Sequence, residues 1–424
     1  MKAKLLFLLC VVSFTANAQL PDHIYKANIR TVKLFTSGDM YGYPVLRLDG
    51  NEQLELHFDD LDGDVKWYYY SYVLCDADWK PCKLQSFDYT RGFQTNRINT
   101  YRSSSIVGTR YTHYQAMLPE RNSAPSKAGN YLLKVFLNDD TSKLAFTKRF
   151  LVVNSKTMVS GIVTQPFNGN LFQTHQRVQV NVSTNATLVN TISPQDLKVV
   201  VLQNYTWSSA ALLDRPTIFR GNYYEYSDDE RTTFPAGKEW RWIDLRSLRL
   251  MSERMKKIVD SDTSNRIDVY VQPDEERRQK VYIYTSDING LYTMENRDNN
   301  NPFWQSDYAW VHFTFVPPGH KAYEGKSVYV FGELTNYEQN EDSKMTFNEE
   351  QGVYERSLFL KQGYYNYSYV TLTDKRDMPA SYDNTEGNYW GTENSYMILV
   401  YFRPFGARYD ELVGYGRFNS NFQR

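Results

Sequence analysis

The sequence predicts an all-β protein built from a row of β-sandwich domains. Short segments, such as residues 54–58 and 177–182, alternate apolar and polar side chains with the two-residue period of half-buried strands. Turn-forming pairs such as Asn168-Gly169 and Asn289-Gly290 lie between these segments. The chain also contains 35 Tyr, 23 Phe and 8 Trp, and aromatic residues favour strands. Many short strands at this spacing are typical of β-sandwiches.

The N-terminus has the pattern of a secretory signal peptide. Lys2 and Lys4 precede an apolar run over residues 5–12, and Ala16-Asn17-Ala18 forms a small-residue cleavage site. We therefore expect residues 1–18 to be removed during export. No later segment approaches the roughly 20 apolar residues of a spanning helix, so we expect no transmembrane segment in the mature chain.

The length of the mature chain predicts several domains, because about 400 residues exceed what one hydrophobic core usually serves. Residues 150–153 resemble a final strand followed by a linker, and a second break falls at Val316-Pro317-Pro318-Gly319. These breaks predict domains over residues 19–154, 155–317 and 318–424. The formal net charge of −1 argues against nucleic acid as a partner, since such partners require a basic face.

One segment departs from the strand pattern and predicts a short basic amphipathic helix. Its apolar residues recur at helical spacing from Leu245 to Ile258. The basic side chains around them are either a solvated face or a docking site for an acidic partner or a membrane surface. The candidate partner-binding residues are Arg246, Arg249, Arg254, Lys256 and Lys257.

Signatures of enzymes are absent from the sequence, which predicts a binding protein without catalytic residues, cofactor or metal. No phosphate-binding, nucleophile-elbow or zinc-protease motif occurs, and the six histidines lack metal-ligand spacing. Residues 59–64 contain four aspartates, which could supply oxygen ligands to calcium. An EF-hand loop starting at Asp60 would, however, lack the Gly at its sixth position and the Glu at its twelfth, so a turn is the simpler interpretation. Cys75 and Cys82 either form a disulfide or are two small buried groups.

The third domain resembles early-set immunoglobulin-like modules that accompany glycogen-active enzymes. The resemblance lies in residues 328–337, 354–360 and 363–370. Tyr337 stands where those modules place a tryptophan that stacks on a sugar ring. This resemblance implies an alternative function, a cell-envelope glycan-binding protein, with Tyr337, Tyr389 and Trp390 as candidate contacts.

Five sequence segments, in the same order along the chain, resemble the plug protein family of the Bacteroidetes type IX secretion system. They are residues 67–79, 87–93, 111–114, 128–135 and 234–248. We expect tandem immunoglobulin-like sandwiches, and the resemblance to the plug family implies a periplasmic protein without catalysis. It also implies the partner, a very large outer-membrane translocon barrel whose periplasmic opening the protein binds and occludes.

Overall fold

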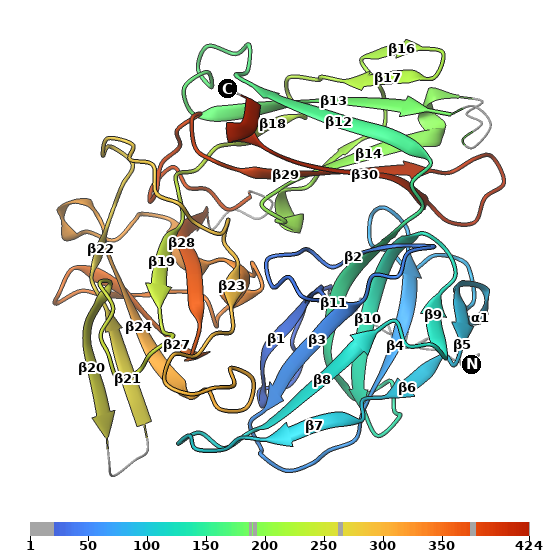
Figure 1. Cartoon of the computed structure of the whole chain (residues 1–424). Coiled ribbons are helices and arrows are strands. Elements are labelled where there is room, and N and C mark those ends of the chain that lie inside the picture. Colours follow the sequence, from blue (N-terminus) through green and yellow to red (C-terminus); the bar gives the residue numbers. More distant parts are fainter. Residues whose placement is uncertain (1–20, 186–188, 190–192, 262–265, 374–378, 424) are drawn as a thin grey trace, which may run out of the picture.

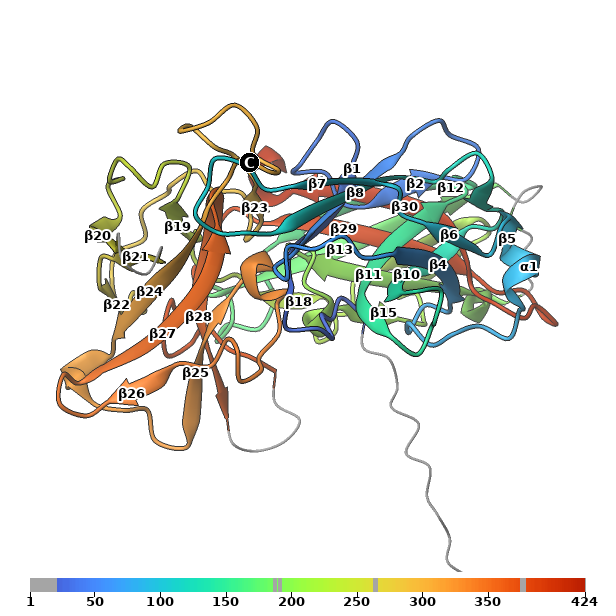
Figure 2. The same cartoon turned by 90° about the horizontal axis from the view of Figure 1, so that it is seen from below.

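Strands make up most of the secondary structure in the computed structural model, which confirms the all-β prediction. The structure describes residues 21–423 except 186–188, 190–192, 262–265 and 374–378, so the predicted signal peptide lies outside the described residues. Three β-sandwiches of two sheets each lie side by side, as the two views of Figures 1 and 2 show. Among the described helices, none has the length and apolar character needed to cross a membrane.

The first sandwich is continuous in sequence and encloses a core rich in aromatic residues. One sheet has the order β1-β3-β8-β7 and the other the order β2-β11-β10-β4-β6. Their bounds are β1 (Ile29–Thr36), β2 (Val45–Arg47), β3 (Leu54–Asp60), β4 (Tyr68–Cys75), β6 (Thr95–Arg97), β7 (Thr100–Ser103), β8 (Thr112–Leu118), β10 (Gly129–Leu137) and β11 (Leu144–Val153). Smaller elements are α1 (Ser86–Tyr89), β5 (Thr90–Gly92) and β9 (Ser123–Pro125).

Tyrosines fill the core of the first sandwich because each phenol combines a large apolar ring with a polar end. In β4, Tyr68 and Tyr70 alternate with more exposed residues and are fully buried. The Tyr68 hydroxyl donates to Asp60 at 2.9 Å, and the Tyr70 hydroxyl donates to Glu120 at 3.1 Å. Burial therefore leaves neither hydroxyl unpaired, and the high tyrosine content is largely a packing feature.

The second sandwich combines the middle of the chain with its C-terminal end. One sheet has the order β12-β13-β17-β16, with β18 beside β13, and the other has the order β15-β14-β29-β30. The bounds are β12 (Thr157–Thr164), β13 (His175–Thr184), β14 (Leu197–Gln203), β15 (Ala211–Leu213), β16 (Ile218–Arg220), β17 (Tyr223–Tyr226), β18 (Thr233–Pro235), β29 (Ser395–Phe402) and β30 (Glu411–Asn419), with short helices η1 (Pro194–Asp196), η2 (Trp207–Ser209) and η5 (Ser420–Gln423).

The third sandwich is formed by the chain between those two parts. Strand β28 pairs with β19, β23 and β25, and the facing sheet has the order β20-β21-β24-β27-β26, with β22 beside β24. The bounds are β19 (Arg241–Asp244), β20 (Met255–Ser261), β21 (Arg266–Val271), β22 (Asp274–Glu275), β23 (Tyr292–Thr293), β24 (Tyr308–Val316), β25 (Lys326–Phe331), β26 (Thr346–Asn348), β27 (Val353–Lys361) and β28 (Tyr364–Thr373), with η3 (Pro318–His320) and η4 (Glu333–Thr335).

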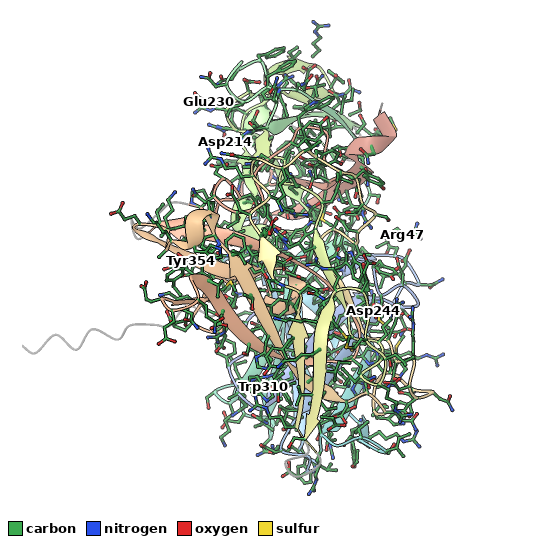
Figure 3. All side chains as sticks on the ribbon, turned by 90° about the vertical axis from the view of Figure 1, so that its left-hand side faces the viewer. Arg47, Asp214, Glu230, Asp244, Trp310 and Tyr354 are labelled. Carbon is green, nitrogen blue, oxygen red and sulfur yellow. The ribbon has the colours of Figure 1, made fainter. Side chains whose placement is uncertain are left out.

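The sheets cross the domain boundary expected near residue 317. Leu197 of β14 pairs with Phe402 of β29, and Arg241 of β19 pairs with Tyr367 of β28. We therefore propose a different division: residues 29–153, residues 157–235 together with 395–419, and residues 241–373. Figure 3 shows this arrangement from the side, with Asp214 and Glu230 on the second sandwich and Trp310 and Tyr354 on the third.

A buried polar cluster joins the first sandwich to the third. Asp59 of β3 accepts hydrogen bonds from Lys361 Nζ at 2.5 Å and from the Tyr308 hydroxyl at 2.6 Å. His113 Nδ1 lies 2.7 Å from Asp59, and its Nε2 lies 3.0 Å from His57 Nδ1. Burial, together with the neighbouring His113, lowers the pKa of His57 to about 4. The cluster therefore links the two sandwiches through fully dehydrated polar contacts.

An apolar interface joins the first sandwich to the second. Leu151 and Val153 of β11 lie in one cluster with Val200 of β14 and with Met397 and Leu399 of β29. Strand β29 is buried along its whole length because one face lines the second sandwich and the other covers the first. The near-continuous apolar sequence of β14 and β29 reflects this double burial.

Candidate binding surfaces and the interdomain cavity

The basic segment predicted as a helix is instead a loop that leads into β20. Residues 245–254 contain no helix, and Met255 pairs with Val271 of β21. Leu245 and Met255 are buried, whereas Leu250 and Met251 between them are exposed. The helix prediction was wrong because the apolar residues at helical spacing do not share one buried face. Leu245 and Met255 anchor the ends of a loop, Leu248 and Ile258 pack partly buried against the core of the third sandwich, and Met251 is exposed.

Two of the five candidate partner-binding residues are held by intramolecular ion pairs. Arg246 contacts Asp244 at 2.7 Å and Glu295 at 3.1 Å. Arg254 donates to Asp274 and, at 3.2 Å, to the hydroxyl of Tyr367. Both arginines therefore already have acidic or phenolic partners and contribute to the structure of the third sandwich.

Arg254 belongs to a buried charge network that stabilises the third sandwich. Arg241 contacts Asp274 at 2.7 Å and Glu386 at 2.9 Å. Burial alone would raise the pKa of Glu386, but the charges of Arg241 and Arg277 hold that pKa at about 2. The carboxylate therefore stays ionised in the interior, where the guanidinium groups compensate its lost hydration.

The other three candidate residues, Arg249, Lys256 and Lys257, are exposed. Lys257 lies over the ring of Tyr270 at 4.0 Å. These three cations and the exposed Leu250 and Met251 lie between residues 249 and 257, and we call this set the basic patch. Its mixture of charge and apolar area makes it a candidate contact for an acidic protein or lipid surface.

Tyr337, the first candidate glycan contact, lines a cavity of about 470 Å³ where the three sandwiches meet. Its hydroxyl donates to the carbonyl of Gly290 at 3.4 Å, and burial raises its pKa well above the ordinary value. Aromatic rings form much of the wall, including the stacked pair Tyr43 and Tyr205, whose centroids are 4.5 Å apart. The size and the aromatic lining are those of small-molecule sites.

Charged side chains complete the lining of the cavity. Lys33 contacts Glu333 at 2.5 Å, and Lys148 Nζ donates to Asn336 Oδ1 at 2.8 Å. The guanidinium of Arg149 pairs with Asp22 at 2.6 Å. The cavity is therefore lined by aromatic rings, cations, carboxylates and an amide that come from segments far apart in sequence.

The other two candidate glycan contacts, Tyr389 and Trp390, do not line this cavity. Tyr389 lies against Tyr282 with ring centroids 4.3 Å apart. The backbone N–H of Trp390 donates to Gln173 at 3.0 Å. The structure therefore does not place the three aromatic residues in one site.

Cys75 and Cys82 are free thiols in the structure, with Cys75 buried and Cys82 partly exposed. Burial and the neighbouring Cys82 raise the pKa of the Cys75 thiol to about 12. A thiol with so high a pKa carries almost no thiolate at neutral pH and is a poor nucleophile. The disulfide stays a prediction.

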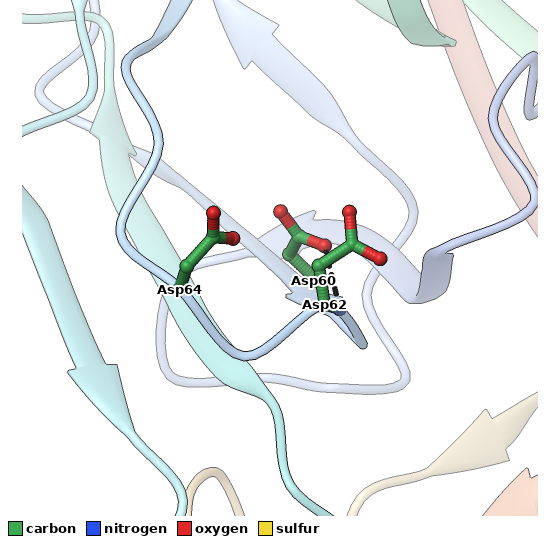
Figure 4. A group of neighbouring side chains, drawn as sticks. All are labelled: Asp60, Asp62 and Asp64. Carbon is green, nitrogen blue, oxygen red and sulfur yellow. Dashed lines mark hydrogen bonds between the residues drawn. The ribbon is translucent and has the colours of Figure 1, made fainter.

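The aspartates predicted to form a turn lie together at the end of β3 and in the loop that follows it (Figure 4). Carboxylate oxygens of Asp60, Asp62 and Asp64 lie within 4.8 Å of one another. Lys66 Nζ contacts all three, at 2.8 Å from Asp60 and 3.3 Å from Asp64. This ammonium group supplies the positive charge that a calcium ion would otherwise provide, so the cluster is explained without a metal.

Sequence reasoning missed a group of three carboxyls between the second and third sandwiches. The backbone N–H of Glu393 donates to Glu239 at 3.2 Å, and the backbone N–H of Trp240 donates to Asp287 at 2.6 Å. Burial and the charge of Asp287 raise the pKa of Glu239 and of Glu393 to about 7, and burial raises that of Asp287 to about 6. The three residues are too far apart in sequence for any local pattern to reveal them.

Comparisons with known proteins support the resemblance found in the sequence. Residues 29–154 match the family model described as the type 9 secretion system plug protein 1st domain. The crystal structure of a hypothetical protein from Parabacteroides merdae is 31% identical, with a TM-score of 0.90. That alignment covers 95% of this chain and 100% of the other. No curated protein matches this chain.

Proposed function

Because the chain belongs to the type 9 secretion system plug protein family, we propose that it binds and occludes the periplasmic opening of the outer-membrane translocon barrel. Family membership gives the protein a role in type IX secretion and a location in the cell envelope. The proposal adds the periplasmic side, the barrel as the partner, and a role that requires no catalysis. The observation that carries it is the match of the first sandwich to the plug family model.

Occlusion of a wide pore requires a body that does not deform, and the buried interfaces supply one. Asp59 and Lys361 join the first and third sandwiches, and both side chains are at most 1% exposed. Separating the sandwiches would break this ion pair and the other contacts that both charged groups make. The three sandwiches are therefore expected to bind and leave the barrel as one unit.

Reversible occlusion favours a polar interface of moderate size over a large apolar one. The basic patch suits such a role because Arg249, Lys256 and Lys257 are exposed. Charges at the rim of an interface mainly raise the association rate, and their effect is screened by salt. This would let the plug return quickly to an empty opening and still be displaced.

Affinity capture tests the proposal directly. A tagged chain, recovered from native membranes in mild detergent, should co-purify a giant outer-membrane barrel. A tagged periplasmic protein of similar size serves as the control. Recovery of the chain without the barrel would contradict the proposal.

A permeability measurement tests occlusion separately from binding. Deletion of the chain, with the barrel retained, should make the outer membrane permeable to large antibiotics that are normally excluded. Re-expression of the chain should restore the barrier. Unchanged antibiotic sensitivity in the deletion strain would count against an occluding role.

A second candidate function, binding of a cell-envelope glycan, is supported by the position of Tyr337 in the interdomain cavity. Calorimetry with maltooligosaccharides should give heat that is lost in Tyr337→Ala and kept in Tyr101→Ala, which removes an exposed tyrosine elsewhere. The absence of heat at millimolar ligand would exclude this class of glycan.

A further inference from the structure

Residues 281–286 have the sequence of a strand but no strand partner. The run Val-Tyr-Ile-Tyr-Thr-Ser consists almost entirely of strong strand formers, and the sequence predicts a strand over residues 281–284. In the structure the segment contains no helix, turn or bend, and it belongs to none of the sheets. The segment therefore prefers the strand conformation but pairs with no strand in the described part of the chain.

The backbone of this segment is open to pairing. Within the described residues, the N–H and C=O groups of Val281 and of residues 283–286 have no hydrogen-bond partner. Elsewhere in the molecule, strands of similar composition use these groups in sheets. A run of unpaired main-chain donors and acceptors can serve as a template for an added strand.

One side chain attaches the segment to the rest of the molecule, and the others are exposed. The Tyr282 hydroxyl donates to Glu239, and its ring lies 4.3 Å from that of Tyr389. Val281 and Ile283, two positions apart, are 87% and 75% exposed. Tyr282 therefore attaches the segment, whereas Val281, Ile283 and Tyr284 face solvent.

Both ends of the segment are fixed. At its start, Lys238 Nζ donates to the carbonyls of Arg277 at 2.5 Å and Lys280 at 2.9 Å. At its end, the Asp287 carboxylate accepts the backbone N–H of Trp240 at 2.6 Å. The segment is therefore held in place before any partner arrives, which reduces the entropy lost on pairing.

An exposed apolar strand without a partner is a liability for a soluble protein. Segments with high strand propensity, no proline and no charge promote edge-to-edge aggregation. Natural proteins usually interrupt such segments with charges, yet residues 281–286 contain none. An exposed segment that promotes aggregation and is nevertheless present indicates that the segment has a function.

We propose that residues 281–286 form a docking strand that pairs with a β-strand of the translocon, by addition of one strand to another. The unpaired backbone selects an extended peptide over a helix or a lipid headgroup, because only a strand satisfies a row of main-chain groups. Arg278, exposed and without an ion pair within the described residues, adds a preference for an acidic residue beside the incoming strand. This inference rests on the proposed function and names the contact through which the plug is held.

The test is capture of the barrel by variants of the full-length chain. Ile283→Lys places a charge among the exposed side chains of the segment, and Thr285→Pro removes one of its unpaired backbone donors. Phe405→Lys is the matched control, since Phe405 is a 98% exposed apolar residue in a distant loop. We expect Ile283→Lys and Thr285→Pro to capture at least tenfold less barrel than the wild type, and Phe405→Lys to capture as much.

Other outcomes overturn the inference in distinguishable ways. Equal capture by all variants would refute the docking strand and leave the proposed function standing. Failure of the wild type to capture the barrel would refute both. If the wild type instead forms a dimer that Ile283→Lys abolishes in sedimentation measurements, the occupant is a second copy of the chain, and the assignment to the translocon is wrong. Thermal melting of each variant should match the wild type, because these side chains are exposed.

Discussion

Asp59 and Lys361 are 302 positions apart in sequence, yet they form a direct contact in the interior. Burial lowers the pKa of Lys361, and the adjacent Asp59 opposes that effect. The Lys361 ammonium also lies 4.3 Å from the centre of the Tyr111 ring. At the scale of single residues, each charge is tolerated in the interior only because the other is present.

Removal of one member of this pair should be costly. Lys361→Met leaves Asp59 buried without its main partner, and such changes destabilise proteins by about 3–5 kcal/mol. The matched control is Lys344→Met, whose partner Glu341 lies 3.7 Å away in an exposed pair, with an expected cost of about 0–1 kcal/mol. Urea unfolding measures both variants. Equal costs would contradict the role assigned to the buried pair.

The carboxyl group of Glu393 predicts a pH dependence with a definite sign. Burial, followed by the charge of Asp287, raises its pKa from the ordinary 4.5 to about 7 in the folded protein. Between about pH 5 and 7 the folded chain holds a proton that the unfolded chain has released. The group therefore favours folding at pH 5, and this contribution is lost as the pH rises through 7.

Glu393→Gln removes this titration, so its stability relative to the wild type should increase between pH 5 and pH 8. We expect a change of roughly 1–3 kcal/mol, since one pKa unit corresponds to about 1.4 kcal/mol. Glu350→Gln, at an exposed carboxyl, is the control and should show no such trend. Urea unfolding at several pH values measures the difference, and a flat difference profile would refute the raised pKa.

At the scale of elements, the two sheets of the second sandwich meet closely where β12 crosses β30. A Cβ atom at Gly161 of β12 would lie 2.2 Å from the ring of Phe418 on β30. Such a contact forces either the ring or the strand to shift. The close approach of these two strands therefore requires a glycine at this position.

Gly161→Val should destabilise the protein by about 1–3 kcal/mol through overpacking. Ser160→Val, at the exposed neighbouring position of the same strand, should have little effect because its side chain points to the opposite face. Differential scanning fluorimetry compares the two variants. A melting temperature of Gly161→Val equal to that of Ser160→Val would show that the sheets separate easily.

The loop before β20 and β20 itself carry the basic patch, and its charge should affect docking. Reversal of Arg249, Lys256 and Lys257 to Glu should reduce capture of the barrel about tenfold at low salt and less at high salt, because salt screens exposed charges. The control reverses three exposed cations elsewhere, namely Arg121, Arg220 and Lys321. Equal capture by the two triple variants would exclude the basic patch as a contact.

At the scale of the whole molecule, the order of the chain differs from the order of the sandwiches. The chain completes the first sandwich, begins the second, builds the third and returns to finish the second with β29 and β30. The second sandwich is therefore completed only after the chain has formed the third. This connectivity couples the two sandwiches and supports a single rigid body.

The connectivity predicts which fragments fold. A fragment of residues 19–154 contains every strand of the first sandwich and should give a cooperative melting transition. A fragment of residues 155–317 lacks β27, β28, β29 and β30 and should remain unfolded, whereas residues 155–424 should fold. Circular dichroism and amide NMR dispersion distinguish the outcomes. A folded 155–317 fragment would contradict the proposed division and restore the boundary near residue 317.

The sequence by itself determined the all-β fold and the membership of a secretion family. Alternation in segments such as β4 and β13 is a local property with a period of two residues, so it is visible without knowledge of partners. The sequence segments that carry the family resemblance are each contiguous, so they too can be recognised without knowledge of the fold. These predictions were confirmed where the structure and the family model address them.

Only the tertiary structure decided which strands share a sheet and which charges share a site. The pairing of β14 with β29, the contact of Asp59 with Lys361 and the meeting of Glu239 with Glu393 all join distant segments. The basic segment was misassigned as a helix for a related reason: spacing shows where apolar residues recur, but not which surface they meet. Local sequence fixes the preference of each segment, whereas burial and pairing depend on the energy of contacts between segments that folding brings together.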